Sequence, residues 1–399
     1  MARTACAALV AAAALAHAAA AAGVVEMPIT FRNSYAMVGV EAGTPSEEHF
    51  LRFDTGSAST WIMDKKCAQG GCDNYSGFSR VGYSLDASST GEPINASASV
   101  DYLGGRIAGP SMRDTFHVGD TTWSQTFVNV NESSWAQLPG DGFLGLAFDT
   151  ISDGSTHTVP ETLLGEGALA APRFGLYLGT ELNDTNGKPG EGVLSLGGSH
   201  EDKYVEGDLT WLPVMKQASS TGGPEAYQLW RAPLLKFSGS YAGADGKPVT
   251  GGRDWEGQWK ASGVFDTGAG TISVPSVDVY LMYQSIGWDF SAIMNHDHIP
   301  LCTEFNSTWS VTFSFAGDAP GEYRDMVLTG DQLARPGYAN RDDACWPPFE
   351  SGNGDGFFLF GNALLDQFYT VWDFGGTKPD EYKPRFGFGQ LKKEYKPYF

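Results

Sequence analysis

Phe53-Asp-Thr-Gly-Ser57 recurs later in the chain as Phe265-Asp-Thr-Gly-Ala269, and this repeat decides the fold. Each copy follows an apolar stretch. Further along, each half carries an apolar pair that ends in glycine, Phe143-Leu-Gly145 in the first half and Leu359-Phe-Gly361 in the second. Two halves of similar design predict two lobes related by an approximate twofold axis, with their boundary near Tyr204–Leu212.

The repeated aspartates, Asp54 and Asp266, suit the hydrolysis of an amide bond. Without a metal or a covalent nucleophile, one group must take a proton from water and another must polarise the carbonyl. Two carboxylates within hydrogen-bonding distance share one proton near acidic pH and supply both roles. A single Asp-Thr-Gly would be read as a turn cap, but the matched pair favours catalysis. The residues after each aspartate can shape and brace the two loops: Thr55 and Gly56 in the first, Thr267 and Gly268 in the second.

Composition favours a folded protein of short strands. The 399 residues are 42% hydrophobic and 13% aromatic, and 51 glycines and 21 prolines imply many turns. Short helices are expected around Val159–Gly165 and Val277–Ile286, and surface loops at Ala218–Glu225 and Tyr241–Arg253. Short apolar or alternating runs predict strands of a mainly antiparallel β protein; they are Tyr35–Val40, Phe50–Phe53, Thr126–Val130, Phe174–Leu178, Val193–Leu196 and Ser310–Phe315.

The chain is strongly acidic. It has 26 Lys and Arg residues against 47 Asp and Glu residues, a formal net charge of −21 at pH 7. This balance argues against binding to nucleic acid, whose phosphates would be repelled. It suits work in an acidic medium, where many carboxylates are protonated, but simple solubility explains it equally well.

The N-terminus predicts secretion. Arg3 precedes an Ala-rich apolar run over Thr4–Ala16, and Ala18–Ala22 offers A-x-A cleavage sites, so residues 1–22 resemble a signal peptide. A membrane anchor is the alternative, but the run is short and His17 interrupts it. We expect an extracellular protein without a stable membrane anchor, with a vacuole-like or lysosome-like compartment as the other possibility.

The cysteines agree with secretion. Cys6 leaves with the signal peptide, and the remaining four cysteines allow three pairings. One local disulfide in each half is the simplest of these. Paired zinc-ligand spacing is absent, and His296-Asp-His298 is better explained as a solvated loop than as a metal site, so no cofactor or metal is expected. Sequons for N-glycosylation lie at Asn74, Asn95, Asn131, Asn183 and Asn306.

From about Tyr35 to Gly389, the chain resembles the pepsin-like (A1) family of aspartic endopeptidases. Besides the two Asp-Thr-Gly loops, the matching motifs are Trp61, Tyr102 in a hairpin and Asp141-Gly-Phe-Leu-Gly-Leu146. The shared-proton pair described above is itself known from such enzymes. The resemblance implies an all-β, bilobal fold, with two pseudo-twofold-related, β-barrel-like lobes (residues 23–205 and 206–399) and a cleft between them. Disulfides are placed by the family at Cys67/Cys72 and Cys302/Cys345.

The resemblance also implies residue roles. Asp54 and Asp266 match the catalytic pair, and Ser57 matches the hydroxyl that donates to the first carboxylate. Tyr102 matches the flap tyrosine that closes over substrate, although a packed strand aromatic is the alternative. Trp61 matches the residue whose indole steadies that tyrosine, although plain core packing explains it nearly as well.

The sequence departs from the family pattern at several positions. Leu103 and Arg106 alter the flap, Ala269 replaces a frequent hydroxyl residue, and Asn362 stands where many members have aspartate. Arg52 replaces an aliphatic residue. Only about a dozen residues separate the expected signal cleavage from the start of the match, so activation by a long basic propeptide in cis is not expected.

Two hypotheses follow from these departures. Arg52 lies two residues before Asp54 on a strand and so shares its face. It would make the pocket before the scissile bond tolerant of acidic or polar residues and help keep Asp54 ionised. In the alternative, Arg52 sends its charge to solvent or to Glu47 or Glu48. Since Ser57 donates to Asp54 and Ala269 cannot donate to Asp266, Asp54 should hold the charge and Asp266 the proton.

The sequence thus predicts a secreted acid endopeptidase that acts through activated water, without a covalent intermediate. Its partners are expected to be extended peptides or unfolded proteins, and the enzyme itself a monomer. A catalytically weak pepsin-like binding or inhibitor protein is the alternative.

Overall fold

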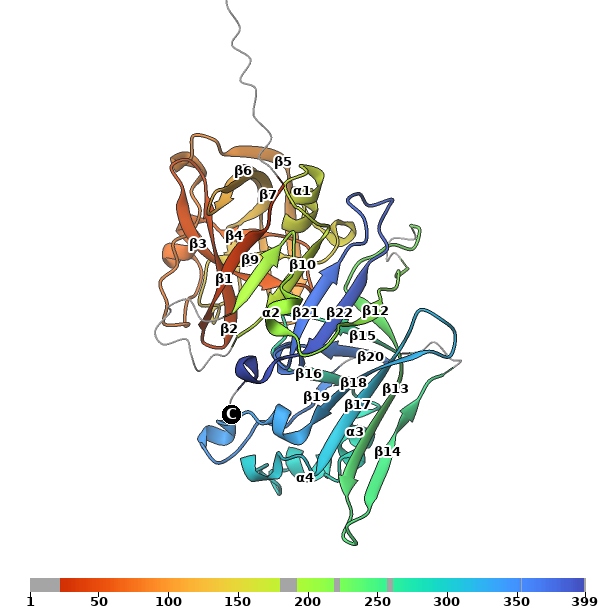
Figure 1. Cartoon of the computed structure of the whole chain (residues 1–399). Helices are drawn as coiled ribbons and strands as arrows, with labels where there is room; N and C mark the ends of the chain where they lie inside the picture. The colour runs from red at the N-terminus through yellow and green to blue at the C-terminus, as the bar shows by residue number, and fades with distance from the viewer. Residues whose placement is uncertain (1–21, 180–191, 219–222, 257–260, 353, 398–399) are drawn as a thin grey trace, which may run out of the picture.

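The computed structural model describes residues 22–179, 192–218, 223–256, 261–352 and 354–397. The expected signal peptide, with Cys6, and the sequon at Asn183 lie outside these residues, as does part of the loop expected at 218–225. No helix in the described ranges is long and apolar enough to cross a bilayer. Figure 1 shows the first half of the chain above the second, with β21 and β22 between them.

The described strands of the first half lie in one large sheet, which also includes strands of the second half. The pairing of β2 with β6 curls its N-terminal part back on itself. In spatial order its strands are β12 (Thr210–Pro213), β22 (Arg385–Gln390), β21 (Phe368–Asp373), β10 (Arg173–Tyr177), β11 (Val193–Leu196), β1 (Val25–Arg32), β2 (Tyr35–Ala42), β3 (Glu47–Asp54), β9 (Gly142–Gly145), β4 (Trp61–Met63), β7 (Thr121–Val130), β6 (Gly105–Val118) and β5 (Glu92–Tyr102), with β8 (Glu132–Ser133) beside β6.

The second sheet belongs to the second half alone. Its strands, in spatial order, are β18 (Tyr323–Thr329), β17 (Trp309–Ala316), β13 (Arg231–Ala242), β15 (Ala261–Phe265), β20 (Phe357–Phe360), β16 (Ile272–Pro275) and β19 (Glu350–Gly352), with β14 (Pro248–Asp254) beside β13. The α-helices of the described residues are short: α1 (Val159–Gly165), α2 (Glu201–Tyr204), α3 (Val279–Ser285), α4 (Phe290–Met294) and α5 (Asn362–Leu365). The mostly β, bilobal architecture predicted from the sequence is confirmed.

The two halves repeat one construction around the Asp-Thr-Gly loops. In the first, β3 runs parallel to β9, and Asp54 is opposite Gly145. In the second, β15 runs parallel to β20, and Phe265 is opposite Phe360. In each half a further short strand, β4 or β16, pairs antiparallel with the same partner. The internal repeat in the sequence therefore corresponds to a repeat in three dimensions.

A six-stranded segment of the large sheet joins the halves. Strands β12, β22 and β21 come from the second half, whereas β10, β11 and β1 come from the first. At their junction Arg173 is opposite Asp373, and their side chains form a 2.8 Å ion pair. The lobe division after residue 205 stays a prediction, because strands from both sides of it share this sheet.

The predicted strand runs and both predicted helices are present. Helix α1 begins where expected because Thr158 accepts from the Glu161 N–H (3.3 Å) and Pro160 fits the first turn. The prediction of a surface loop at Tyr241–Arg253 was wrong. Residues 248–254 form β14, whose ladder with β13 satisfies the backbone of a glycine-rich, polar segment.

The two local disulfides are formed, Cys67–Cys72 and Cys302–Cys345, with Cα–Cα distances of 4.6 and 4.8 Å. The second ties the segment that precedes β17 to the segment before β19. The segment before β19 carries Trp346 and Phe349, which line a cavity described below.

Candidate active site

The two Asp-Thr-Gly loops meet face to face and are braced by a reciprocal set of buried hydrogen bonds. The Thr55 N–H donates to the Thr267 hydroxyl, and the Thr267 N–H donates to the Thr55 hydroxyl, both at 3.0 Å. The Thr55 hydroxyl then donates to the Phe265 carbonyl and the Thr267 hydroxyl to the Phe53 carbonyl, also at 3.0 Å. Because each hydroxyl both donates and accepts, the two threonines fix the relative position of the loops.

Gly56 and Gly268 let the loops approach closely enough to bring the carboxylates together. A Cβ atom placed on Gly56 would lie 2.5 Å from Oδ1 of Asp266. A Cβ atom on Gly268 would overlap the carboxylate of Asp54 and lie 2.9 Å from Oδ1 of Asp266. Both distances are below van der Waals contact, so each loop needs glycine because the opposite carboxylate occupies the space of a side chain.

The two carboxylates have unequal sets of donors. Asp54 accepts from the Gly56 N–H at 2.8 Å and from the Ser57 hydroxyl at 2.5 Å. Asp266 accepts from the Gly268 N–H at 2.7 Å, and Ala269 offers no hydroxyl. Burial, followed by the charge of Asp54 and hydrogen bonding with it, raises the pKa of Asp266 well above its usual range. The asymmetry favours a proton on Asp266, in the direction expected from the sequence.

The hairpin of β5 and β6 carries Tyr102 at its tip, followed by Leu103, which is 92% exposed. The Tyr102 ring packs against Phe143 and Trp135, with ring centres 5.4 and 5.9 Å apart. Trp61 is fully buried and stacks on Phe143 at 4.9 Å. The tip of the β5–β6 hairpin, the flap, therefore packs on an aromatic cluster.

The polar atoms of this cluster are largely unsatisfied. The Tyr102 hydroxyl and the Trp61 indole N–H are buried, and among the described residues neither forms a hydrogen bond of regular geometry. Burial and then the charge of Asp54 raise the pKa of Tyr102, while Trp61 and Ser57 oppose the rise. The hydrogen bond expected from the Trp61 indole N–H to the Tyr102 hydroxyl is thus not formed with regular geometry, although the two side chains lie in one cluster.

A cavity of about 470 Å³ lies between the two loops and the flap. Asp54, Asp266 and Ser57 are on its floor, and Tyr102 and Leu103 are on the flap side. Three further acidic residues contribute to its wall: Asp101, Asp153 and Glu350. None of the three was predicted from the sequence, since Asp153 and Glu350 lie outside the recognised motifs and the match around Asp101 concerns its neighbour Tyr102.

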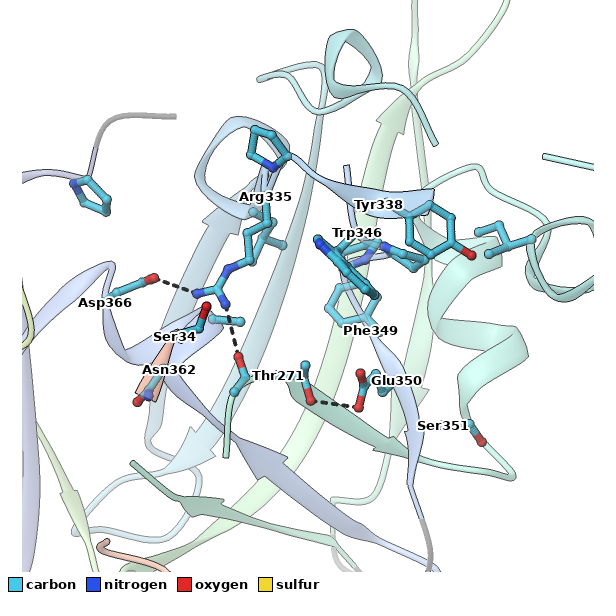
Figure 2. Close-up of a pocket in the computed structure, with 18 of the residues that line it drawn as sticks. Ser34, Thr271, Arg335, Tyr338, Trp346, Phe349, Glu350, Ser351, Asn362 and Asp366 are labelled. Carbon is cyan, nitrogen blue, oxygen red and sulfur yellow. Dashed lines mark hydrogen bonds and ion pairs between the residues drawn. The ribbon is translucent and has the colours of Figure 1, made fainter. Parts of the chain in front are cut away.

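A second cavity, of about 960 Å³, opens beside the first and shares Gly270, Thr271 and Glu350 with it. We call it the side cavity. Figure 2 shows its two walls: Arg335 and Asp366 face an aromatic wall that includes Trp346 and Tyr338. Arg335 donates to Asp366 at 2.6 Å and to the Gly270 carbonyl at 3.1 Å, so it ties this wall to the second catalytic loop. The two cavities together form a long depression with an acidic centre and an apolar extension.

Arg52 lies elsewhere than either sequence interpretation placed it. It is only 8% exposed, its guanidinium is 4.6 Å from the ring centre of Tyr35 and 5.6 Å from that of Phe143, and it does not line the catalytic cavity. The alternative prediction, in which the Arg52 guanidinium reaches solvent or Glu47 or Glu48, was wrong. The side chain is buried, and Glu47 forms its ion pair with Lys65. The positive charge of Arg52 opposes the rise in the pKa of Asp266 that burial and Asp54 cause. Cation–π contacts hold the guanidinium behind the cavity wall.

Other predicted residues are placed as follows. Asn362 donates to the Thr267 carbonyl at 3.3 Å, and its own carbonyl oxygen is buried without a partner among the described residues. The sequon residues Asn74, Asn95 and Asn131 are exposed, and Asn306 is half-buried; their glycosylation stays a prediction. His298 pairs with Glu304 at 3.0 Å. Within the described ranges, no group of three or more metal-ligating side chains is found.

Comparisons with known proteins agree with this geometry. A family model described as "Eukaryotic aspartyl protease" matches residues 34–379. Gastricsin of Cavia porcellus is 25% identical over 356 residues, which cover 88% of this chain and 80% of the relative. The vacuolar aspartic protease of Candida albicans is 26% identical over 358 residues, covering 88% and 76%. Cathepsin D of Dictyostelium discoideum is 27% identical over 363 residues, covering 88% and 84%.

Proposed function

Since the chain belongs to the eukaryotic aspartyl protease family and is an aspartic endopeptidase, we propose that it cleaves peptide bonds with a water molecule activated between Asp54 and Asp266. The observation that carries this mechanism is the close approach of the two loops, in which each glycine leaves room for the opposite carboxylate. In the described part of the chain this pair lies in a cavity open to substrate.

The unequal surroundings of the carboxylates support a division of labour. Asp54, ionised and held by Gly56 and Ser57, takes a proton from water as the water oxygen attacks the carbonyl carbon. Asp266, whose pKa is raised, gives its proton to the carbonyl oxygen. The C–N bond of the tetrahedral intermediate then breaks as Asp54 gives the proton it took from water to the amide nitrogen, and a hydroxyl of the intermediate returns a proton to Asp266. No bond forms between enzyme and substrate.

The substrate is proposed to be an extended peptide or an unfolded protein, bound between lobes of residues 23–205 and 206–399. The catalytic cavity and the side cavity are continuous, which supports binding of several residues on either side of the cleaved bond. Tyr102 and Leu103 would cover the central residues. We place the mature enzyme outside the cell as a glycosylated monomer; a vacuolar location is the alternative, as the name of the Candida albicans relative indicates for that protein.

A pepsin-like binding or inhibitor protein without turnover is not favoured. Such a protein would not need both carboxylates, two loop glycines and reciprocal threonines, and all of these are present and assembled. The altered flap and Arg52 leave this assembly intact.

Digestion of a denatured protein across a range of pH tests the proposal. We expect cleavage into peptides in acidic buffer, complete inhibition by a statine-type transition-state analogue, and no effect of metal chelators or serine-directed reagents, because neither a metal nor a covalent nucleophile takes part. Digestion that resists the analogue, or that a chelator abolishes, would contradict the mechanism.

A second experiment addresses the shared proton. Ala269→Thr places a hydroxyl beside Asp266, and a hydrogen bond to the charged carboxylate lowers its pKa. The alkaline limb of the pH–rate profile, where the pair loses its shared proton, is therefore expected to move toward acid. The apparent pKa values of kcat/KM measured on one peptide give the result. A profile that stays in place or moves toward alkaline pH would refute the assignment of the proton to Asp266.

A further inference from the structure

The wall of the catalytic cavity is acidic beyond the two catalytic aspartates. Among the described residues that line it, none is lysine, arginine or histidine. The three further carboxylates come from different parts of the chain: Asp101 from the flap, Asp153 from the loop before α1, and Glu350 from the start of β19. A cation placed in this cavity would therefore meet negative charge from several sides.

These three carboxylates differ in whether they already have a partner. Asp101 lies 3.7 Å from Arg106, and Glu350 accepts from the Thr271 hydroxyl at 2.9 Å. The carboxylate of Asp153 makes no hydrogen bond or ion pair with any residue that the structure describes. Asp153 is an exposed residue, and the partial desolvation of its carboxylate in the cavity raises its pKa. Asp153 is thus the carboxylate of this wall that is open to a charge from outside the protein.

The backbone of Asp153 is held on both sides. Its N–H donates to the Ser59 hydroxyl at 2.9 Å, which ties the loop to the segment after the first catalytic motif. Its carbonyl accepts from the Thr156 N–H at 3.2 Å and from the Thr156 hydroxyl at 2.7 Å. A group held in this way needs little further ordering when a ligand binds, so more of its interaction energy contributes to affinity.

Asp153 also acts on the flap residue across the cavity. Burial is the main cause of the raised pKa of the Tyr102 hydroxyl, and the negative charges of Asp54 and, to a smaller extent, Asp153 add to it. A side chain that enters between the flap and the loop at Asp153 therefore passes through the field of this carboxylate. A lysine or arginine there would relieve an unpaired, partly desolvated charge, whereas an acidic side chain would be repelled.

We propose that Asp153 is a specificity determinant that makes this endopeptidase prefer substrates with a lysine or arginine within a few residues of the cleaved bond. This inference rests on the proposed function of the cleft and adds a substrate class to it. The net charge of −21 acts in the same direction, since it attracts cationic peptides from solution. This preference for basic residues takes the place of the tolerance for acidic residues that the sequence suggested. Arg52, on which that tolerance depended, does not line the cavity, whereas Asp153 does.

The test compares lysine with its uncharged isostere norleucine. One peptide series carries either residue at each position from the third before to the third after a single cleavable bond, and mass spectrometry identifies the bond that is cut. At one or more positions, we expect the wild type to show a lysine-to-norleucine ratio of kcat/KM of about ten or more. In Asp153→Asn, which keeps the side-chain shape, this ratio should fall to near one. The assays run at the highest pH at which the wild type still turns over, so that Asp153 is ionised.

Asp120→Asn is the matched control. Asp120 is an exposed residue in the turn between β6 and β7, so this variant changes the net charge equally without touching the cavity. It should keep the wild-type ratio. Equal loss of the ratio in both variants, or a wild type with no lysine preference at any position, would overturn the proposal. Failure of the proposed function would look different, since neither lysine nor norleucine peptides would then be cut in a manner that the statine-type analogue blocks.

Discussion

Asparagine in place of either Asp54 or Asp266 is expected to lower kcat for peptide hydrolysis by at least about a thousandfold. The amide cannot take a proton from water, nor can it supply the acid proton that polarises the carbonyl. Each variant therefore loses one of two roles that must act in the same step. Initial rates on a fluorogenic peptide at several pH values measure the effect.

Two comparisons separate this loss from misfolding. Asparagine has the shape of aspartate and can still accept from the Gly56 or Gly268 N–H, so thermal unfolding should remain cooperative in both variants. Since the carboxylates act as a unit, the double variant should be about as slow as either single one. A verified single variant that retained a tenth of wild-type activity would remove the residue concerned from the catalytic pair.

Gly56→Ala is expected to cause the second-largest loss, with kcat/KM reduced by about a hundredfold or more. The added methyl group would lie 2.5 Å from Oδ1 of Asp266. Either the loops must separate, which strains the reciprocal threonine bonds, or the carboxylate must turn away from its partner. A misplacement of about 1 Å in a catalytic group is enough for a loss of this size. Stopped assays on the same peptide, with a parallel urea titration, measure both activity and stability.

Gly165→Ala provides the control for this substitution. Gly165 ends α1, its φ is not in the left-handed region, and nothing lies within 4 Å of the added Cβ atom. Its activity and stability should match those of the wild type. If Gly56→Ala also stayed within threefold of wild-type activity, the close approach of the two loops could not be a requirement of catalysis.

The sequence predicted the elements whose residues carry their own signal. The strand runs are apolar or show an alternation of apolar and polar residues, and the Asp-Thr-Gly repeat marks both loops. Strand β14 was missed because its glycines and polar residues lack that alternation, and only pairing with β13 makes it a strand. The pattern places Arg52 on the face of Asp54, but it cannot show that Tyr35, from the neighbouring strand, and Phe143 cover the guanidinium.

The rest of the site depends on residues that meet only after folding. Asp153 lies in a loop whose composition is ordinary, and its importance comes from the Ser59 hydroxyl and the flap opposite. The side cavity draws residues from Phe31 to Pro397, so no local stretch of sequence contains it. Spacing and periodicity report on neighbours along the chain, whereas these features arise from neighbours across lobes.

The sheet that joins the halves also decides when activity can first arise during synthesis. Strand β10 pairs with β21, which lies about 200 residues later, and β21 in turn pairs with β22 near the end of the chain. A nascent chain on the ribosome can form the first catalytic loop early, yet Asp266 and the strands that join the halves follow only later. Contacts of such long range form slowly and late. The growing polypeptide therefore stays unable to cut proteins around it until nearly all of it has been made.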